Sequence, residues 1–305
     1  MIHAITSLIP GARQSFTGVP IIDLSHKYEN HLAAHISLMR HIASKGIDAE
    51  LPDAPGRKLP KPLVDRIRYI VNHGKSGIVT LEKTHLDTFK VMQDSLDHEL
   101  GGYIDFGKNG EVDFVQTFFG DDLSVDIRNY ASIEVCWHTH TYYHDNRPFS
   151  PPSPADLISS FEEFEITGAQ IQLVFTREGT YVFWPRVSAL LDYYTGKWGE
   201  RRINEEFRTF QKLFDEACET ADMRRFNEHI NDIGFELFLV PWGKRLNLAF
   251  FVVPDHTAAR EKLGMDRLPR RPRKRARRGK RPFKAKVVGG YRSKVETLFR
   301  SNSKQ

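Results

Sequence analysis

Two histidines and one aspartate near the middle of the chain have the types and the spacing of a metal site. They lie in residues 133–156, which read IEVCWHTHTYYHDNRPFSPPSPAD. If residues 133–140 form a strand, the side chains alternate between its two faces, so that His138 and His140 point the same way. Two imidazoles on one strand face can reach the same ion. Asp156 is the natural candidate for a third ligand.

The aspartate stands where a helix is expected to begin. Ser153 has the type of an N-cap, Pro154 that of a first helical residue, and Asp156 falls in the first turn. The apolar residues that follow recur at helical spacing until Gly168. Two His and one Asp, each expected about 2.0–2.2 Å from the ion, leave a fourth tetrahedral position for water. This arrangement is typical of a catalytic rather than a structural zinc site.

Hydrolysis at such a site also needs a base. Zinc lowers the pKa of bound water towards about 7, and a carboxylate usually receives the proton. Glu99 offers one where an amphipathic helix runs into an apolar strand that begins with two glycines. Glu111 and Glu134 are also near the motif in sequence, and Glu134 is expected on the strand face of the histidines. The residues alone therefore leave three candidate bases.

Together these residues resemble the JAMM motif of the JAB/MPN metalloproteases, in which an upstream Glu precedes His-x-His and Ser-x-x-Asp. The resemblance covers residues 78–185. It implies that Glu99 is the general base, that Ser153 steadies the oxyanion, and that His138, His140 and Asp156 ligate Zn2+. It also implies cleavage of an amide or isopeptide bond, in eukaryotic members typically the bond that joins ubiquitin or a ubiquitin-like protein to lysine.

The sequence departs from the family pattern after the second histidine. Thr141 stands where the family usually has Pro, and the twelve residues between His140 and Ser153 form a longer spacer than is common. We expect this spacer to form a distinct rim of the site. His144 within it is an alternative ligand or a solvent-facing loop residue. Cys136 is an alternative nucleophile or a small buried strand residue.

The order of predicted elements indicates an α/β protein with a mixed β-sheet flanked by helices. The resemblance refines this to the JAB/MPN, deaminase-like architecture, with an N-terminal helical segment and a C-terminal α+β extension. Helical spacing predicts a helix in residues 31–43, and prolines predict an extended connector at 51–62. We expect four regions: an N-terminal segment with its connector at 1–62, a metalloprotease-like domain at 63–195, a helix–strand extension at 196–263, and a disordered basic tail at 264–305.

The extension has two possible arrangements. Residues 200–231 have helical periodicity, and two strand-like apolar runs follow at 235–240 and 246–253. These segments form a separate subdomain or pack onto the preceding unit. Sequence periodicity does not distinguish the two, because it reports which face is apolar and not what covers that face.

The positive charge of the chain belongs to its tail. The formal net charge of the chain is +5. The segment from Arg267 to Lys286 carries twelve Lys or Arg and no acid, so the rest of the chain has a net charge of −7. Such a run suits sequence-independent contact with nucleic acid or nuclear import, and Phe283 is its only aromatic residue. Two cysteines suit a reducing compartment, and no apolar stretch is long enough for a membrane helix. We therefore expect an intracellular protein of the nucleus or cytoplasm, without membrane contact.

These features support more than one class of function. The first hypothesis is a JAMM-type zinc metallopeptidase or isopeptidase that acts on ubiquitin or ubiquitin-like conjugates, with the tail directing it to nucleic acid or the nucleus. The second is a JAMM-like fold used as a structural or nucleic-acid-associated assembly protein without catalysis. The third is a nucleic-acid-processing metalloenzyme, whose metal site has similar ligands.

Overall fold

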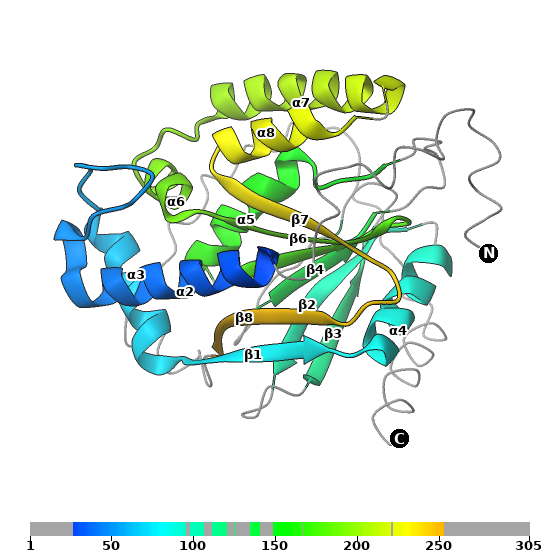
Figure 1. Cartoon of the computed structure of the whole chain (residues 1–305), viewed down its shortest axis with the longest axis horizontal. Coiled ribbons are helices and arrows are strands. Elements are labelled where there is room, and N and C mark those ends of the chain that lie inside the picture. Colours follow the sequence, from blue (N-terminus) through cyan, green and yellow to red (C-terminus); the bar gives the residue numbers. More distant parts are fainter. Residues whose placement is uncertain are drawn as a thin grey trace, which may run out of the picture. The chain divides into compact units, whose positions relative to one another are not determined.

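The computed structural model describes residues 27–95, 98–106, 112–120, 125, 135–140, 149–166, 168–220 and 222–252 (Figure 1). These residues form a six-stranded mixed sheet, a two-stranded ribbon and helices on both faces of the larger sheet. The predicted α/β class, a mixed sheet flanked by helices, is confirmed. The finer JAB/MPN, deaminase-like architecture stays a prediction. No helix among the described residues is both long and apolar enough to cross a membrane.

The larger sheet has the strand order β3-β2-β4-β5-β6-β7. Neighbouring strands run antiparallel except β4 and β5, which are parallel and are joined through helix α5, because a parallel pair needs a crossover connection. Strands β5 and β6 form a tight antiparallel pair, with Glu178 in the turn between them. The strands are β2 (Leu100–Phe106), β3 (Val112–Phe119), β4 (Val135–Thr139), β5 (Ile171–Phe175), β6 (Gly179–Pro185) and β7 (Phe235–Pro241).

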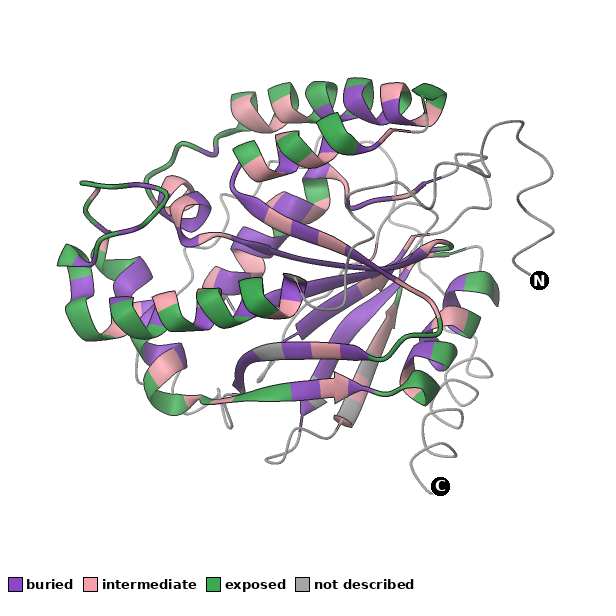
Figure 2. Cartoon of the chain, viewed as in Figure 1, coloured by how far each residue is buried: buried purple, intermediate pink, exposed green. Residues whose placement is uncertain are grey.

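Different elements cover the two faces of this sheet. On one face, Phe89 of α4 (Lys83–Ser95) stacks on Phe175 at 4.1 Å between ring centroids and meets the edge of Trp137 at 4.8 Å. On the other face, Cys136 contacts Glu163 of α5 (Pro154–Ile166). Figure 2 shows that the central strands are buried along most of their length. Strands covered on both sides are expected to be mostly apolar, as β5 and β6 are.

The two-stranded ribbon lies on the α4 side of the sheet. Strand β1 (Lys75–Leu81) pairs antiparallel with β8 (Leu246–Val252). Phe250 packs on Phe106 of β2 with centroids 5.2 Å apart, and the amide side chain of Gln170 exchanges two hydrogen bonds with the backbone of Phe251. The side chain of Gln170 therefore takes the place of a neighbouring strand at the outer edge of β8.

The N-terminal helix is built into the same body. Helix α2 (Lys27–Lys45) contains the predicted helix at 31–43, and it packs against α3 (Lys61–His73) and β8. After the short 3-10 helix η3 (Gly46–Asp48), the predicted extended connector contains a bridge between Leu51 and Ala54. Leu51, Ala54 and Leu59 are buried. The segment is thus tethered by its apolar side chains and does not act as a free spacer.

The helical periodicity predicted for residues 200–231 is confirmed. These residues form two helices, α7 (Glu200–Thr220) and α8 (Arg224–Asp232). The break has a local cause, since the Asp222 carboxylate accepts a hydrogen bond from the backbone N–H of Arg224 and competes with helical continuation. Of the two arrangements left open, the structure has the packed one: β7 extends the large sheet and β8 pairs with β1. Helix α6 (Val187–Tyr194) connects β6 to this part.

Candidate metal centre

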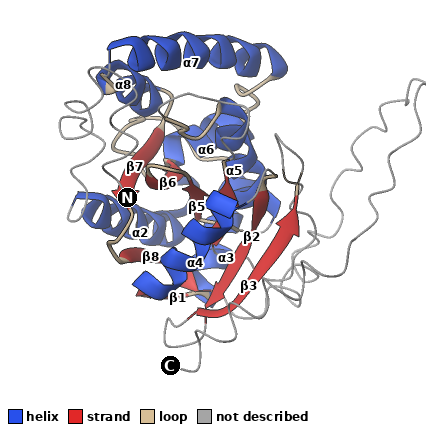
Figure 3. Cartoon of the chain, turned by 90° about the vertical axis from the view of Figure 1, so that its right-hand side faces the viewer, coloured by secondary structure: helices blue, strands red, loops and turns tan. Residues whose placement is uncertain are grey.

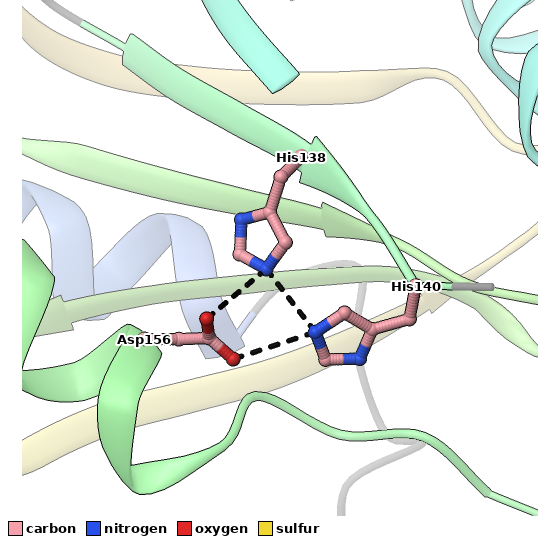
Figure 4. Close-up of side chains that lie close together, drawn as sticks. All are labelled: His138, His140 and Asp156. Atoms are coloured by element: carbon pink, nitrogen blue, oxygen red, sulfur yellow. Dashed lines mark hydrogen bonds and ion pairs between the residues drawn. The ribbon is translucent and has the colours of Figure 1, made fainter. Parts of the chain in front are cut away.

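His138, His140 and Asp156 converge on one point (Figure 4). The Nε2 atoms of the two histidines are 3.1 Å apart. His138 Nε2 lies 3.3 Å from Asp156 Oδ1, and His140 Nε2 lies 3.4 Å from Asp156 Oδ2. All three side chains are mostly buried, with 13–20% of their surface exposed. Among the described residues they form a group that can hold a metal ion.

The spacing of the donor atoms fits a metal. Four ligands at about 2.0–2.1 Å from a tetrahedral ion lie about 3.3–3.4 Å from one another. The two histidine nitrogens are 3.1 Å apart, and each lies 3.3–3.4 Å from one carboxylate oxygen, Oδ1 for His138 and Oδ2 for His140, so the three side chains are within reach of one ion. Two imidazole nitrogens and one carboxylate oxygen are also a donor set that divalent transition metals accept. The residues therefore fit a metal ion by type and by separation.

Strand β4 brings the two histidines together as the alternation predicts. His138 belongs to the strand and His140 follows its last residue, Thr139. The backbone N–H of His140 donates to the carbonyl of Phe175 on β5, and its carbonyl accepts a hydrogen bond from Gln93 of α4. The second histidine is thus held at the strand end by neighbours on two elements.

Helix α5 positions the aspartate through a reciprocal cap. The backbone N–H of Ser153 donates to Asp156 Oδ2 at 2.6 Å, and the N–H of Asp156 donates to Ser153 Oγ at 3.3 Å. This is the capping box predicted from the order of residues. The helix ends at Ile166, and Gly168, with a φ of 82° and an N–H that bonds to carbonyls of the last turn, caps its C-terminus. A ligand in the first turn is therefore fixed by the same interactions that start the helix.

A chain of hydrogen bonds outside the cluster orients the ring of His140. Its Nδ1 lies 3.0 Å from the carbonyl oxygen of Ser150, so that Nδ1–H donates there and Nε2 faces the cluster. The backbone N–H of Ser150 in turn donates to Glu178 at 2.7 Å. Tyr181 donates its hydroxyl to the same Glu178 oxygen at 2.9 Å.

The cluster is strongly coupled electrostatically. Burial by itself raises the pKa of Asp156, but the charge of His138 and hydrogen bonds from both imidazoles hold it well below its usual range. Burial lowers the pKa of His140, but the hydrogen bond to Asp156 and the charges of Asp156 and Glu99 outweigh burial and raise it to about 9. Asp156 is therefore an anion at neutral pH, as a metal ligand must be.

Glu99 lies beside this cluster, at the start of β2. In the antiparallel pair of β2 and β4, Gly101 is opposite His138, and the N–H of Leu100 donates to Thr139 Oγ1 at 2.9 Å. The same register carried towards the N-terminus sets Glu99 opposite His140, in agreement with its electrostatic influence on that residue. Glu99 is not one of the three grouped ligands. Its carboxylate is near enough to influence His140 electrostatically, and its role as a base stays a prediction.

Comparison with known proteins identifies no family for this chain. No family model, no curated protein and no solved structure matches this chain. The function is therefore inferred from the residues of the site itself.

Several alternatives from the sequence lie outside the described residues. These are the competing acids Glu111 and Glu134, the extra histidine His144, the spacer residue Thr141, and the basic run at 267–286. Cys136 is described. Burial, together with its contact to Glu163, raises the pKa of this thiol well above its usual value. It is 2% exposed, as expected of a small buried strand residue rather than a nucleophile.

Sequence reasoning missed the residues that support His140. Ser150 acts through its backbone carbonyl, which has no side-chain signature. Glu178 stands outside the motif, in the turn between β5 and β6, and its carboxylate accepts a hydrogen bond from the segment before α5. A polar residue in a hairpin turn beside a buried strand is a weak signal, because most such residues simply face solvent.

Proposed function

We propose that this protein is a zinc-dependent metallopeptidase of the JAMM type that hydrolyses an amide or isopeptide bond, with ubiquitin or ubiquitin-like conjugates as its substrates. The observation that carries the proposal is the convergence of His138, His140 and Asp156 with Glu99 beside them. The choice of substrate rests on the resemblance of these residues to the JAMM motif.

Two metals are candidates for this donor set. Two histidines and one carboxylate bind zinc tetrahedrally, and they also bind iron(II) in non-haem oxygenases, as one face of an octahedron. The separation of 3.1 Å between the two histidine nitrogens lies between the values of about 2.9 Å for an octahedral face and about 3.3–3.4 Å for a tetrahedron, so it does not choose between the metals. The proposal names zinc because the resemblance of the residues to the JAMM motif implies zinc.

Zinc, when bound, lowers the pKa of water and polarises the scissile carbonyl. The residues of the chain supply the remaining chemistry. The carboxylate of Glu99 accepts a proton from the water while the water oxygen attacks the carbonyl carbon. The same carboxylate then delivers that proton to the nitrogen of the departing amine as the C–N bond breaks. Glu99 therefore ends the cycle unchanged.

Ser153 is placed to assist the developing oxyanion. Its Oγ accepts a hydrogen bond from the N–H of Asp156, which leaves its own O–H free to donate. The residue also lines the cavity beside the cluster, together with His140. A hydroxyl held at a helix start donates to a carbonyl oxygen that gains negative charge, which stabilises the transition state more than the substrate.

The test combines metal analysis with cleavage assays on the full chain. We expect one zinc per chain, and cleavage of diubiquitin or of a ubiquitin-like conjugate. Glu99→Gln should retain zinc and lower kcat by about 100- to 10,000-fold, because it removes the base and no ligand. Glu82→Gln, a change of the same kind at an exposed position, is the matched control and should behave like the wild type.

Two outcomes would contradict the proposal. One is a purified protein without stoichiometric zinc. The other is a Glu99→Gln variant that cleaves as fast as the wild type. Stoichiometric zinc without cleavage of any of these conjugates would instead favour the second hypothesis, a JAMM-like assembly protein without catalysis.

A further inference from the structure

The peptide group that joins Glu99 to Leu100 is held from two sides. Its C=O, which belongs to Glu99, accepts a hydrogen bond at 2.8 Å from the backbone N–H of Gly120, the residue after β3. Its N–H, which belongs to Leu100, donates at 2.9 Å to Thr139 Oγ1 on β4. Figure 3 shows β2 and β3 side by side at one edge of the larger sheet. Both hydrogen bonds are made where Glu99 leads into β2.

These two bonds fix the orientation of the peptide plane. The C=O and N–H of a trans peptide are coplanar and point in opposite directions, and the Cα atoms on either side are in the same plane. Rotation of the plane about the line between those Cα atoms would lengthen both hydrogen bonds. The Cα of Glu99 is one of the two atoms, so the bonds also fix the point from which its carboxylate extends.

The bond to Thr139 uses a side chain where two strands meet. The register of β2 and β4 ends with Gly101 opposite His138, which places Leu100 opposite Thr139 one residue further on. There the acceptor for the N–H of Leu100 is the threonine hydroxyl. Leu100 is 0% exposed and Thr139 is 1% exposed, so water does not reach this N–H. Without the hydroxyl, a buried donor would lose its partner and the peptide group would lose one of its two supports.

Thr139 stands between the two histidines of the metal centre. Side chains alternate along a strand, so His138 and His140 face the cluster and Thr139 turns away from it. The helix that precedes Glu99 is tied to the same strand end, because Gln93 of α4 donates to the carbonyl of His140 at 3.2 Å. Three consecutive residues of one strand end therefore supply two metal ligands and support the backbone on which the candidate base stands.

We propose that Thr139 is a positioning residue for the reaction, whose hydroxyl sets the carboxylate of Glu99 at the separation from the metal centre that proton transfer requires. The inference rests on the proposed function, in which Glu99 is the base. A base acts only within hydrogen-bond reach of the proton that it takes, and a displacement of about 1 Å can lower a rate about 100-fold. The hydroxyl of Thr139 therefore controls the rate through Glu99, without contact to metal or substrate.

The test compares Thr139→Val, which replaces the hydroxyl by a methyl group, with Thr139→Ser, which keeps the hydroxyl. Cleavage of diubiquitin, or of the ubiquitin-like conjugate that the wild type cleaves, is measured per zinc-loaded full chain. Thr139→Val should lower kcat at least about ten-fold and change KM less than about two-fold, because the substrate contacts remain. Thr139→Ser should keep kcat within about three-fold of the wild type. Thr88→Val is the matched control, since it changes another buried threonine that bonds to the backbone, and it should behave like the wild type.

A double substitution separates positioning from a general effect on the fold. If Thr139 acts through Glu99, adding Thr139→Val to Glu99→Gln should change the residual rate less than about two-fold, because the group that the hydroxyl positions is already absent. A purely structural effect would lower the rate by the same factor in both backgrounds. Equal factors, or an unchanged kcat in Thr139→Val, would overturn the inference.

A second measurement needs neither zinc nor substrate. Amide hydrogen exchange is followed by NMR in the presence of EDTA on the full chain labelled at its leucine nitrogens. Relative to the buried Leu173 of β5, exchange at Leu100 should be at least about ten-fold faster in Thr139→Val and unchanged in Thr139→Ser. Unchanged exchange in Thr139→Val would overturn the inference.

The two measurements also distinguish failure of the inference from failure of the proposed function. If the wild type holds no zinc or cleaves no conjugate, the proposed function fails, while the exchange at Leu100 still decides whether Thr139 fixes this peptide group. If the wild type cleaves and Thr139→Val cleaves equally fast, only the positioning role fails.

Discussion

Asp156 has two roles in this structure, and its substitution can separate them. Its carboxylate faces both histidines, and it also accepts the hydrogen bond that caps α5. Asp156→Asn removes the charge but keeps an oxygen that can accept from the N–H of Ser153. Ser153→Ala removes the hydroxyl of the cap and leaves all three ligands. Asp156→Asn should therefore weaken metal binding more than Ser153→Ala does, whereas Ser153→Ala should destabilise the metal-free fold through loss of the cap.

The magnitudes follow from linkage between binding and folding. At a free zinc concentration 100 times its Kd, zinc should raise the free energy of unfolding of the wild type by about 2.7 kcal/mol. Asp156→Asn, with affinity about 100-fold weaker, should gain only about 0.4 kcal/mol at the same concentration. Ser153→Ala, with affinity about ten-fold weaker because it only supports a ligand, should gain about 1.4 kcal/mol. Without metal, loss of the cap should cost Ser153→Ala about 1 kcal/mol.

The assay is urea unfolding of each protein with EDTA and at one buffered zinc concentration, with zinc affinity measured separately by competition with a chelating dye. The reasoning is refuted if Asp156→Asn gains as much stability from zinc as the wild type. In that case the aspartate would be a helix cap and no ligand. Equal loss of zinc affinity in both variants would also refute the separation of the two roles.

Three further predictions concern the support of the site and the fold. Glu178→Ala should weaken zinc binding about ten-fold without removing a ligand, because Ser150 and the ring of His140 lose their support. Competition with a chelating dye measures the zinc affinity, and an unchanged affinity would contradict the prediction. Burial lowers the pKa of His35, which packs near Trp184, to about 4. The unfolded chain binds this proton below about pH 6.5 and the folded chain does not, so stability should fall from pH 6.5 to pH 4 by up to about 3 kcal/mol. Urea unfolding of His35→Leu across this pH range should show a smaller fall in the free energy of unfolding than the wild type shows. Gly168→Ala should cost about 1–2 kcal/mol in the same assay, since its φ is positive, and a neutral effect would count against the cap.

The local parts of the site were predictable from the sequence. Alternation along a strand placed His138 and His140 on one face, and the order of Ser153 and Asp156 marked a helix start. Both signals come from residues close together in the chain, where backbone geometry alone fixes which side chains are neighbours.

Only the tertiary structure decided what surrounds the ligands. Periodicity identified the apolar face of residues 200–231, but it could not place Phe207 and Phe210 beside His140. Nor could it pair β8 with β1 or direct Glu178 to Ser150. Apolar contact has no direction and little specificity, so an amphipathic helix fits many surfaces equally well from its sequence. Its partner is chosen by the sum of many contacts across the whole fold, and that sum exists only once the chain has folded.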